Sequence, residues 1–182
     1  MNSYLVLIRG INVGGKNKVS MQELRQRLEE TGYTNVSTYI NSGNVVLASL
    51  KNASDVKKEI ENRLPRWFKL DSELIKVHVI SDGELSLVVK NKPHGFGDEP
   101  SKYHSDVIFL IGIDTDDAFK VFTPREDVDQ VWKGDSVIYS QRLSAELTKS
   151  RLSKIMASPF YKSMTIRTWN TVCKLDDLMK EN

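Results

Sequence analysis

Cysteine is almost missing from this sequence of 182 residues, in which Cys173 is the one example. A single cysteine cannot close a disulfide within the chain, so a small secreted domain stapled by disulfides is disfavoured. The three histidines, His78, His94 and His104, show no zinc-ligand spacing with it. We therefore expect neither a metal site nor a bound cofactor.

Long hydrophobic runs are missing as well. The longest hydrophobic run near the N-terminus extends from Tyr4 to Ile8. It is too short for the core of a signal peptide and has no basic residue before it. No run is long enough to cross a membrane. We expect a cytoplasmic protein with no membrane partner, and a chain of this length can bury a core without disulfides or metal.

An excess of charge of one sign is also missing, because 26 Lys and Arg balance 24 Asp and Glu. The balance hides opposed segments. Residues 1–28 carry five basic residues and one acid, residues 142–174 carry seven and one, and residues 106–135 carry eight acids. The two basic segments are candidates for binding anionic partners.

The first half of the sequence alternates strand and helix patterns. The run from Tyr4 to Ile11 predicts a buried strand, and Ser20 with Glu23 three residues later predicts the start of a helix. The next two runs, 36–41 and 44–48, predict a hairpin with Ser42-Gly43 as a two-residue loop. The remaining elements are a helix ended by Pro65, a strand over 75–79 and a short helix opened by the capping box of residues 81–84.

The same strand pattern returns in the second half. Residues 5–12 line up with 107–114, residues 36–47 with 128–139, and residues 75–81 with 164–170, each without a gap. Three matched blocks in one order indicate duplication. We predict an α+β fold of two tandem ferredoxin-like β-α-β-β-α-β units with largely antiparallel sheets, over residues 1–90 and 106–182, joined by a connector at 91–105.

The two copies differ after their first strand, where the first copy has a longer, glycine-rich loop from Gly10 to Lys18. This loop is one residue short of a nucleotide-binding P-loop, because Asn17 stands where a hydroxyl must hold magnesium. The helix also starts only at Ser20, and a P-loop belongs to a parallel sheet. An ATP hydrolase of that type is therefore disfavoured.

The glycine loop still predicts a binding site. In the expected topology this loop lies beside the hairpin. Its glycines let a ligand approach the backbone, and basic and amide side chains surround the glycines. We expect a small anion or nucleotide to bind there, although turn chemistry alone also explains Asn41 and Asn44. The candidate residues are Arg9, Asn12, Gly14, Gly15, Lys16, Asn17, Asn41, Ser42 and Asn44.

The basic stretch of residues 142–174 offers an alternative function, nucleic-acid binding, with Trp169 and neighbouring aromatic rings for stacking. A plainer interpretation makes its lysines and arginines the solvated face of a helix. The apolar face of that helix would be Leu152, Ile155 and Met156.

No catalytic set has a recognisable spacing. Cys173 falls inside the last predicted helix, where a buried, inert thiol is the default, and His94 and His104 fall in the connector. Whether the protein is an enzyme therefore stays open. A third class, a protein-interaction or self-assembly module that uses an open sheet face, also stays open.

Several blocks of the sequence resemble those of one bacterial family. They are Arg9-Gly10-Ile11-Asn12-Val13-Gly14-Gly15, Thr38-Tyr39-Ile40-Asn41-Ser42-Gly43-Asn44-Val45 and Arg167-Thr168-Trp169-Asn170-Thr171-Val172. They are similar to the signature blocks of the domain of unknown function 1697 family. The resemblance implies two tandem β-α-β-β-α-β units and no established activity. The last block adds Arg167, Trp169 and Asn170 to the candidate ligand-binding residues.

Overall fold

The computed structural model describes residues 1–71 and 75–181. The chain divides into two compact units. The first holds Met1–Ser86 together with the chain from Lys174 onward, and the second holds Leu87–Cys173. Each unit contains one four-stranded sheet in which neighbouring strands are antiparallel, so the fold is of the predicted α+β class.

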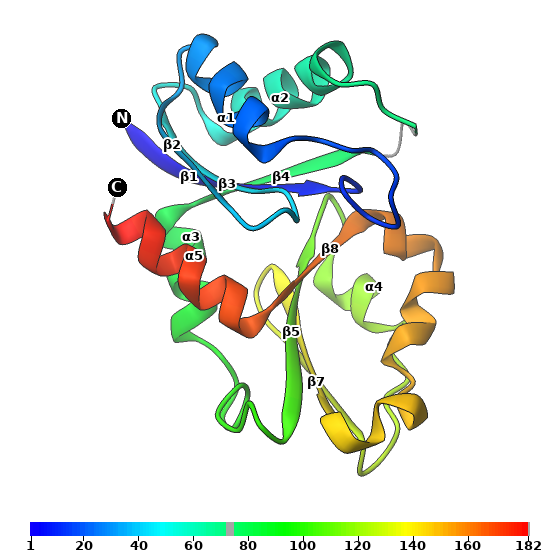
Figure 1. The fold of residues 1–182 in the computed structure, drawn as a ribbon. Coiled ribbons are helices and arrows are strands. Elements are labelled where there is room, and N and C mark those ends of the chain that lie inside the picture. Colours follow the sequence, from blue (N-terminus) through cyan, green and yellow to red (C-terminus); the bar gives the residue numbers. More distant parts are fainter. Residues whose placement is uncertain (72–74, 182) are drawn as a thin grey trace. The chain divides into compact units, whose positions relative to one another are not determined.

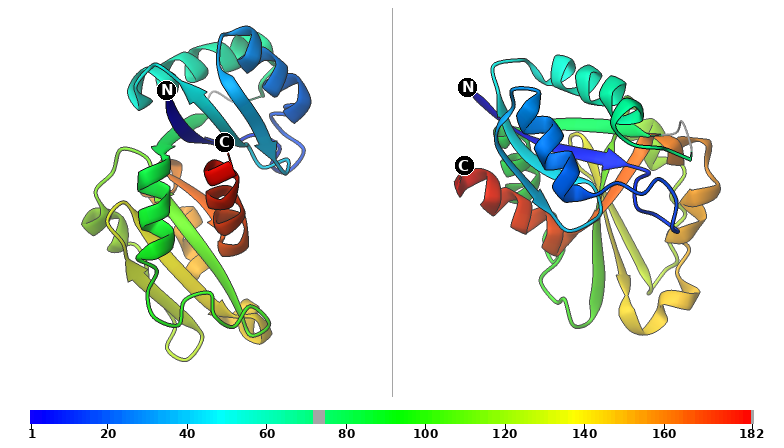
Figure 2. Two further views of the ribbon diagram at one scale, coloured as in Figure 1. Left: turned by 90° about the vertical axis from the view of Figure 1, so that its left-hand side faces the viewer. Right: turned by 45° about the horizontal axis from the view of Figure 1, so that its top comes forward.

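The first sheet has the strand order β2-β3-β1-β4. Its strands are β1 (Asn2–Arg9), β2 (Thr34–Tyr39), β3 (Asn44–Ser49) and β4 (Lys76–Ser81). Two helices, α1 (Met21–Glu30) and α2 (Ala53–Trp67), lie side by side on one face of this sheet (Figure 1, Figure 2). The helices α3 (Asp82–Lys90) and α5 (Trp169–Glu181) both contain a point where the chain passes from one unit to the other.

Helical spacing of apolar residues explains how α1 and α2 pack. The buried side chains are Met21, Leu24 and Leu28 on α1 and Val56, Ile60 and Leu64 on α2. They join one core cluster with the β1 residues Tyr4, Val6 and Ile8. Burying one such aliphatic side chain stabilises the fold by about 1.5–3 kcal/mol, so this face fixes the first unit.

Pro65 lies inside α2, which continues to Trp67, so the prediction that the helix ends at Pro65 is wrong. Proline at this position cannot donate to the carbonyl of Glu61, four residues before it, so the helix loses one backbone hydrogen bond. The amide of Phe68 still donates to the carbonyl of Leu64 at 3.0 Å. Leu64 is fully buried, so packing holds the turn in helical form.

The hairpin between β2 and β3 has a four-residue loop, because Tyr39 pairs with Asn44, and the predicted two-residue loop is wrong. Ile40 and Gly43 have left-handed φ angles of +47° and +77°. The Gly43 carbonyl accepts from the amide of Ile8 at 2.8 Å, and a Cβ on Gly43 would lie 2.6 Å from the Ile8 carbonyl oxygen. Glycine is required there by this close approach.

The second sheet has the order β6-β7-β5-β8. Its strands are β5 (Tyr103–Leu110), β6 (Asp129–Lys133), β7 (Val137–Leu143) and β8 (Met164–Thr168). One short helix, α4 (Thr115–Phe119), follows β5. The first strand starts at Tyr103, inside the segment that we expected to be an irregular connector.

Between β7 and β8 the chain forms three short 3-10 helices instead of the predicted α-helix. They are η1 (Ser144–Lys149), η2 (Leu152–Ala157) and η3 (Pro159–Ser163). Leu152 and Ile155 are buried as expected, but Met156 is 60% exposed. A 3-10 helix has three residues per turn, so positions three apart share a face and Met156 turns away from it.

The three sequence blocks that match between the halves occupy the same places in the two sheets. They form β1 and β5, the hairpins β2-β3 and β6-β7, and β4 and β8. The segment after the first strand spans residues 10–20 in the first unit and 111–114 in the second. The glycine loop, which we define as residues 10–18, is thus a feature of the first unit alone.

No helix in the described ranges has both the length and the apolar character that a membrane crossing needs.

Candidate functional site

The glycine loop is a compact turn that closes on itself. The amide of Asn12 donates to the carbonyl of Asn17 at 3.1 Å, and the amide of Lys16 donates to that of Val13 at 3.1 Å. Left-handed φ angles occur in it at Gly10, Asn12, Gly14, Gly15 and Asn17. Glycine and asparagine are the residues that adopt this conformation most readily, so the composition of the loop follows from its shape.

Asn12 joins the glycine loop to the hairpin, as the expected topology requires. Its side-chain amide donates to the carbonyls of Asn41 and Val19, both at 2.9 Å, and its Oδ1 accepts from the amide of Val19 at 2.9 Å. The two loops that the sequence placed together are therefore neighbours. Asn12 uses its polar atoms to hold them.

Asn17 is buried and binds backbone on both sides. Its Nδ2 donates to the carbonyl of Gly10 at 2.8 Å. Its backbone amide donates to Oδ2 of Asp71 at 2.8 Å, and the amide of Asp71 donates back to Oδ1 of Asn17 at 2.7 Å. Asn17 stabilises the loop and offers no group to a ligand from its 5% exposed surface.

Asn44 has a similar structural role in the hairpin. It is fully buried, and its Nδ2 donates to the carbonyl of Tyr39 and to Oγ of Ser42, both at 3.0 Å. Asn12, Asn17 and Asn44 therefore shape the backbone. For Asn44 this agrees with the turn-chemistry alternative that the sequence left open for Asn41 and Asn44.

An open hollow of about 530 Å³ lies where the glycine loop meets the start of α1. It is lined by Asn12, Gly15, Lys18, Val19, Ser20, Met21, Gln22 and Asn41. Among the described residues the lining holds one cation, Lys18, and no carboxylate. Of the predicted candidates in this unit, only Asn12, Gly15 and Asn41 line the hollow as described. The candidates outside it are Arg9, Gly14, Lys16, Asn17, Ser42 and Asn44.

The start of α1 follows from its capping residue. The Ser20 side chain accepts from the amide of Glu23 at 3.3 Å, as the capping box predicts. The first amides of an α-helix, here those of Met21 and Gln22, have no carbonyl partner inside the helix. Both residues line the hollow, and their amides give it a positive electrostatic potential.

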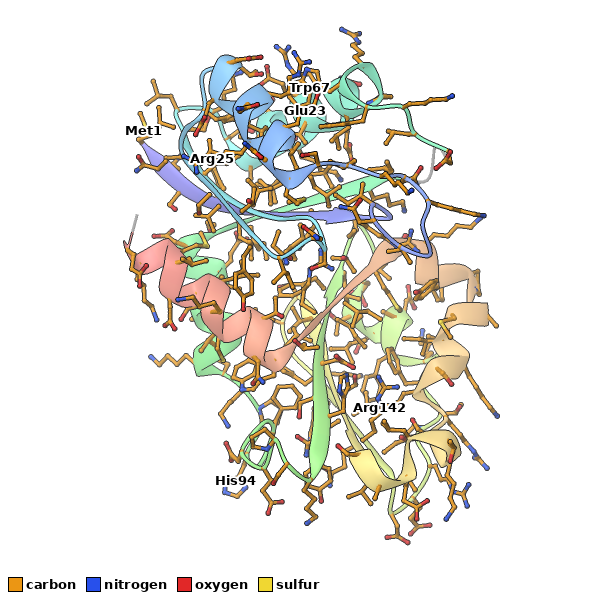
Figure 3. All side chains as sticks on the ribbon, in the orientation of Figure 1. Met1, Glu23, Arg25, Trp67, His94 and Arg142 are labelled. Carbon is orange, nitrogen blue, oxygen red and sulfur yellow. The ribbon has the colours of Figure 1, made fainter. Side chains whose placement is uncertain are left out.

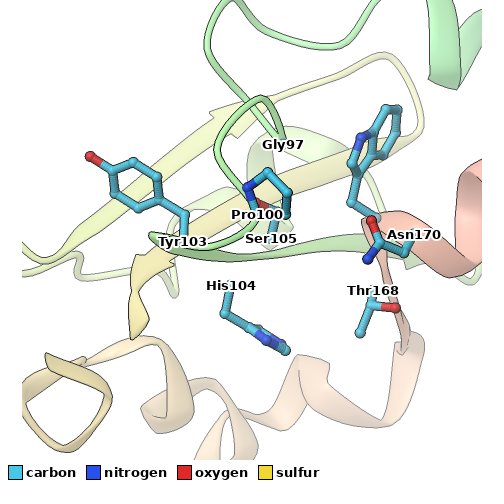
Figure 4. Close-up of a pocket in the computed structure, with 8 residues that line it drawn as sticks. Gly97, Pro100, Tyr103, His104, Ser105, Thr168 and Asn170 are labelled. Atoms are coloured by element: carbon cyan, nitrogen blue, oxygen red, sulfur yellow. The ribbon is translucent and has the colours of Figure 1, made fainter. Parts of the chain in front are cut away.

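A second hollow, of about 220 Å³, lies in the second unit (Figure 4). Its lining includes two of the predicted candidates, Trp169 and Asn170, and a residue that the sequence dismissed, His104. The other lining residues are Gly97, Pro100, Tyr103, Ser105 and Thr168. The candidate residues that line a hollow therefore divide between two hollows, one in each unit.

The end of β8 explains why the second hollow exists. β8 pairs with β5 only as far as Asp106 opposite Thr168, so residues 103–105 of β5 are not paired with β8. The Trp169 ring lies against Gly97, where a Cβ would stand 2.4 Å from the indole, and meets the Phe96 ring edge-on at 5.3 Å. The missing side chain at residue 97 gives the indole its place.

Arg167 is a candidate that does not line this hollow. It is 8% exposed, and its Nη1 donates to Oγ1 of Thr165 at 3.0 Å and to the carbonyl of Ile166 at 2.8 Å. Burial lowers the pKa of Arg167 to about 10. It faces away from His104, because neighbouring strand residues alternate between the two faces and Thr168 shares the face of His104.

His104 belongs to a chain of polar contacts across β5 and β7. Its Nε2 lies 3.2 Å from Oδ1 of Asp106, whose Oδ2 accepts from Nη2 of Arg142 at 3.2 Å (Arg142 is labelled in Figure 3). Burial raises the pKa of Asp106, and the charges of His104 and Arg142 oppose this rise. Sequence reasoning missed this set because it placed His104 in a connector. The two-residue spacing of His104 and Asp106, which puts both on one face of a strand, was the available signal.

Within the described residues, no cluster of three or more His, Cys, Asp or Glu side chains has a geometry that could hold a metal ion. Cys173 is half-buried in α5 and is not part of a disulfide.

Known proteins include relatives of this chain in both sequence and structure. The chain belongs to the DUF1697 family, described as "Protein of unknown function (DUF1697)", whose family model matches residues 1–139. The conserved bacterial protein SP0830 from Streptococcus pneumoniae is a similar solved structure, with 27% sequence identity and a TM-score of 0.82 over 98% of each chain. No curated protein matches the chain.

Proposed function

We propose that the first unit binds a small phosphate-bearing anion, such as a nucleotide, in the hollow between the glycine loop and α1. The observation that carries this proposal is the composition of the hollow, whose described lining residues include Lys18 and polar groups but no carboxylate. A volume of about 530 Å³ falls in the range of roughly 300–1,000 Å³ that holds cofactors and other small ligands.

The backbone of the loop supports the proposal. Gly15 has a φ of +77°, and a Cβ placed on it would meet no atom within 4 Å. The space beside it is open, so an anion can approach the main chain there. The amides at the start of α1 would then face the anion together with the Lys18 ammonium.

The candidate residues divide into two roles under this proposal. Lys18, Gly15 and Gln22 would contact the anion, and Lys16, exposed at the tip of the loop, would add positive charge near it. Asn12, Asn17 and Asn44 hold the two loops in place before any ligand arrives. Such preorganisation reduces the entropy that binding must overcome.

The test adds inorganic phosphate, pyrophosphate or ATP to the protein. It measures the rise in melting temperature and, by calorimetry, the affinity for each anion. We expect Lys18→Ala to weaken binding of the best of these by about tenfold, the effect of one charge-assisted hydrogen bond. Lys58→Ala, which removes an exposed lysine from α2, is the matched control and should bind as wild type does. Equal affinity of Lys18→Ala and wild type for all three anions would refute the proposal.

Nucleic-acid binding through residues 142–174 is the second candidate. Arg151, Lys154 and Lys162 are exposed and, in the described part of the chain, form no ion pair. Lys149 pairs with Glu146 at 2.7 Å, Arg142 pairs with Asp106, and Arg167 is buried, so fewer charges remain than the sequence suggests. This function predicts an affinity for RNA or DNA that falls steeply with salt, and a flat salt response would exclude it.

We also propose that the two units are tandem copies of one ferredoxin-like β-α-β-β-α-β unit. The shared strand order and the three matched sequence blocks support this. In this view the second copy replaced its second helix by η1, η2 and η3.

We propose, separately, a cytoplasmic location. The low cysteine content supports it.

A further inference from the structure

The hollow of the second unit combines one titratable ring with an apolar wall. His104 lines it together with Asn170 and Thr168, while Trp169 and Pro100 supply apolar surface. Figure 4 shows His104 and Thr168 on one side of β5 and Pro100 on the other, so the hollow wraps the free edge of the strand. A ligand there would touch polar groups at one end and rings at the other.

We propose that this hollow binds a small monocarboxylate with an apolar body, whose carboxylate is held by the imidazolium of His104 and whose body lies against Trp169 and Pro100. This site is independent of the anion site in the glycine loop.

The position of His104 is fixed by Asp106. The side chain of Asp106 is 11% exposed, and its carboxylate lies 3.2 Å from Nε2 of His104. A buried carboxylate on one ring nitrogen fixes the orientation of the imidazole. In the described residues Nδ1 of His104 has no partner, so the second donor of the imidazolium remains for a ligand.

The charges behind His104 favour an anion in front of it. Arg142 already compensates Asp106 through the 3.2 Å contact of Nη2 with Oδ2. Asp129 stands opposite Arg142 on β6, but its Oδ2 accepts from the backbone amides of Arg125 and Arg151, and no ion pair joins it to Arg142 among the described residues. The imidazolium charge is therefore left for the ligand.

The nearest loop adds no uncompensated negative charge. In the 97–102 loop Glu99 lies 3.4 Å from Lys102, and Asp98 lies 2.5 Å from Lys92. None of the eight residues that line the hollow is acidic. A carboxylate can therefore enter without meeting like charge.

Size and composition restrict the ligand. About 220 Å³ is below the range that usually holds a drug-sized molecule, so a nucleotide does not fit. None of its described lining residues is a lysine or an arginine, which disfavours a doubly charged phosphate. One imidazolium beside rings suits a single carboxylate on an apolar body.

The experiment titrates benzoate and benzyl alcohol into the full chain at a pH of about 6.5, the ordinary pKa of histidine. The imidazole resonances of His104 and the indole N–H resonance of Trp169 are followed by NMR. The two probes share the ring and differ in charge. We expect benzoate to shift both signals and benzyl alcohol to bind at least about tenfold more weakly.

Variants then test the assigned roles. His104→Gln should weaken benzoate binding at least about tenfold, seen at Trp169, while His94→Gln, in the exposed part of the connector, should bind as wild type does. Asp106→Asn keeps the ring of His104 but removes the carboxylate that orients it, so this variant should weaken benzoate binding. Should His104→Gln fail to fold, the comparison of the two probes on wild type decides.

Three results would overturn the proposal. They are unchanged benzoate binding in folded His104→Gln, equal binding of benzyl alcohol and benzoate, and no shift of either signal with benzoate. Lys18→Ala should leave benzoate binding unchanged, so a failure here is separate from a failure of the anion site in the first unit.

Discussion

Asn17 and Asp71 exchange two hydrogen bonds: each backbone amide donates to the other residue's side-chain oxygen, at 2.8 and 2.7 Å. This reciprocal pair ties the glycine loop to the chain after α2. Asn17 uses its Nδ2 as well, on the carbonyl of Gly10 at 2.8 Å. One side chain thus sets the path of the loop.

Asn17→Ala should therefore lower the free energy of unfolding by about 1–3 kcal/mol, because buried backbone groups lose their partners. Asn91→Ala, at an exposed position after α3, is the control and should change it by less than about 0.5 kcal/mol. Urea unfolding of both variants gives the comparison. Equal stability of Asn17→Ala and wild type would contradict the role assigned to this residue.

Gly97→Ala should destabilise the protein by about 2–4 kcal/mol, because the new Cβ would stand 2.4 Å from the Trp169 indole and the residue has a φ of +73°. Gly95→Ala separates the two causes, since Gly95 has a φ of +80° but open space around it. We expect Gly95→Ala to lower stability by about 1–2 kcal/mol, the backbone part alone. Thermal unfolding with the Trp169 indole resonance as a local probe measures both.

Ile40→Asn should stabilise the protein by about 0.5–1 kcal/mol. Ile40 is β-branched, has a left-handed φ of +47° and is 52% exposed, so it bears backbone strain with little burial in return. Asparagine adopts this conformation more readily. A lower melting temperature for Ile40→Asn than for wild type would show that the Ile40 side chain has a packing role.

Acid should destabilise the first unit through Glu59. Burial tends to raise the pKa of Glu59, but hydrogen bonds from Lys51, Tyr33 and Arg63 outweigh it and lower this pKa to about 2. Because the folded pKa is below that of the unfolded chain, the stabilisation is complete above about pH 4.5 and is lost as the pH falls towards about 2.

Glu59→Gln removes this titration. Its stability should lie below that of wild type at neutral pH, and the difference should shrink as the pH falls through that window. Urea unfolding at a series of pH values measures it. A constant difference across the window would show that Glu59 acts through packing instead.

The first unit was largely predictable from the sequence because its signals are local. Ser20 and Glu23 are three residues apart, and the apolar residues of α1 and α2 recur at helical spacing. Pro65 misled the prediction because proline marks a boundary only when nothing holds the helix beyond it, and Leu64 packs in the core. Tertiary packing overrides a local rule there.

The candidate site was only partly predictable. The sequence could place Asn12 beside the hairpin, but whether its amide meets a ligand or a carbonyl depends on Asn41, which is 29 residues away. His104 was missed for a related reason. Its partners Asp106 and Arg142 become visible only when β5 is known to begin at Tyr103 and to pair with β7. Long-range pairing supplies what local patterns lack.

The three 3-10 helices between β7 and β8 should make this segment the preferred site of cleavage by trypsin. Short 3-10 turns carry weaker hydrogen bonds than an α-helix of the same length, so they open more readily. Lys149, Arg151 and Lys154 lie there with exposed side chains. A brief digest of the native protein should nick the chain at these residues first and leave β8 and α5 together on one fragment.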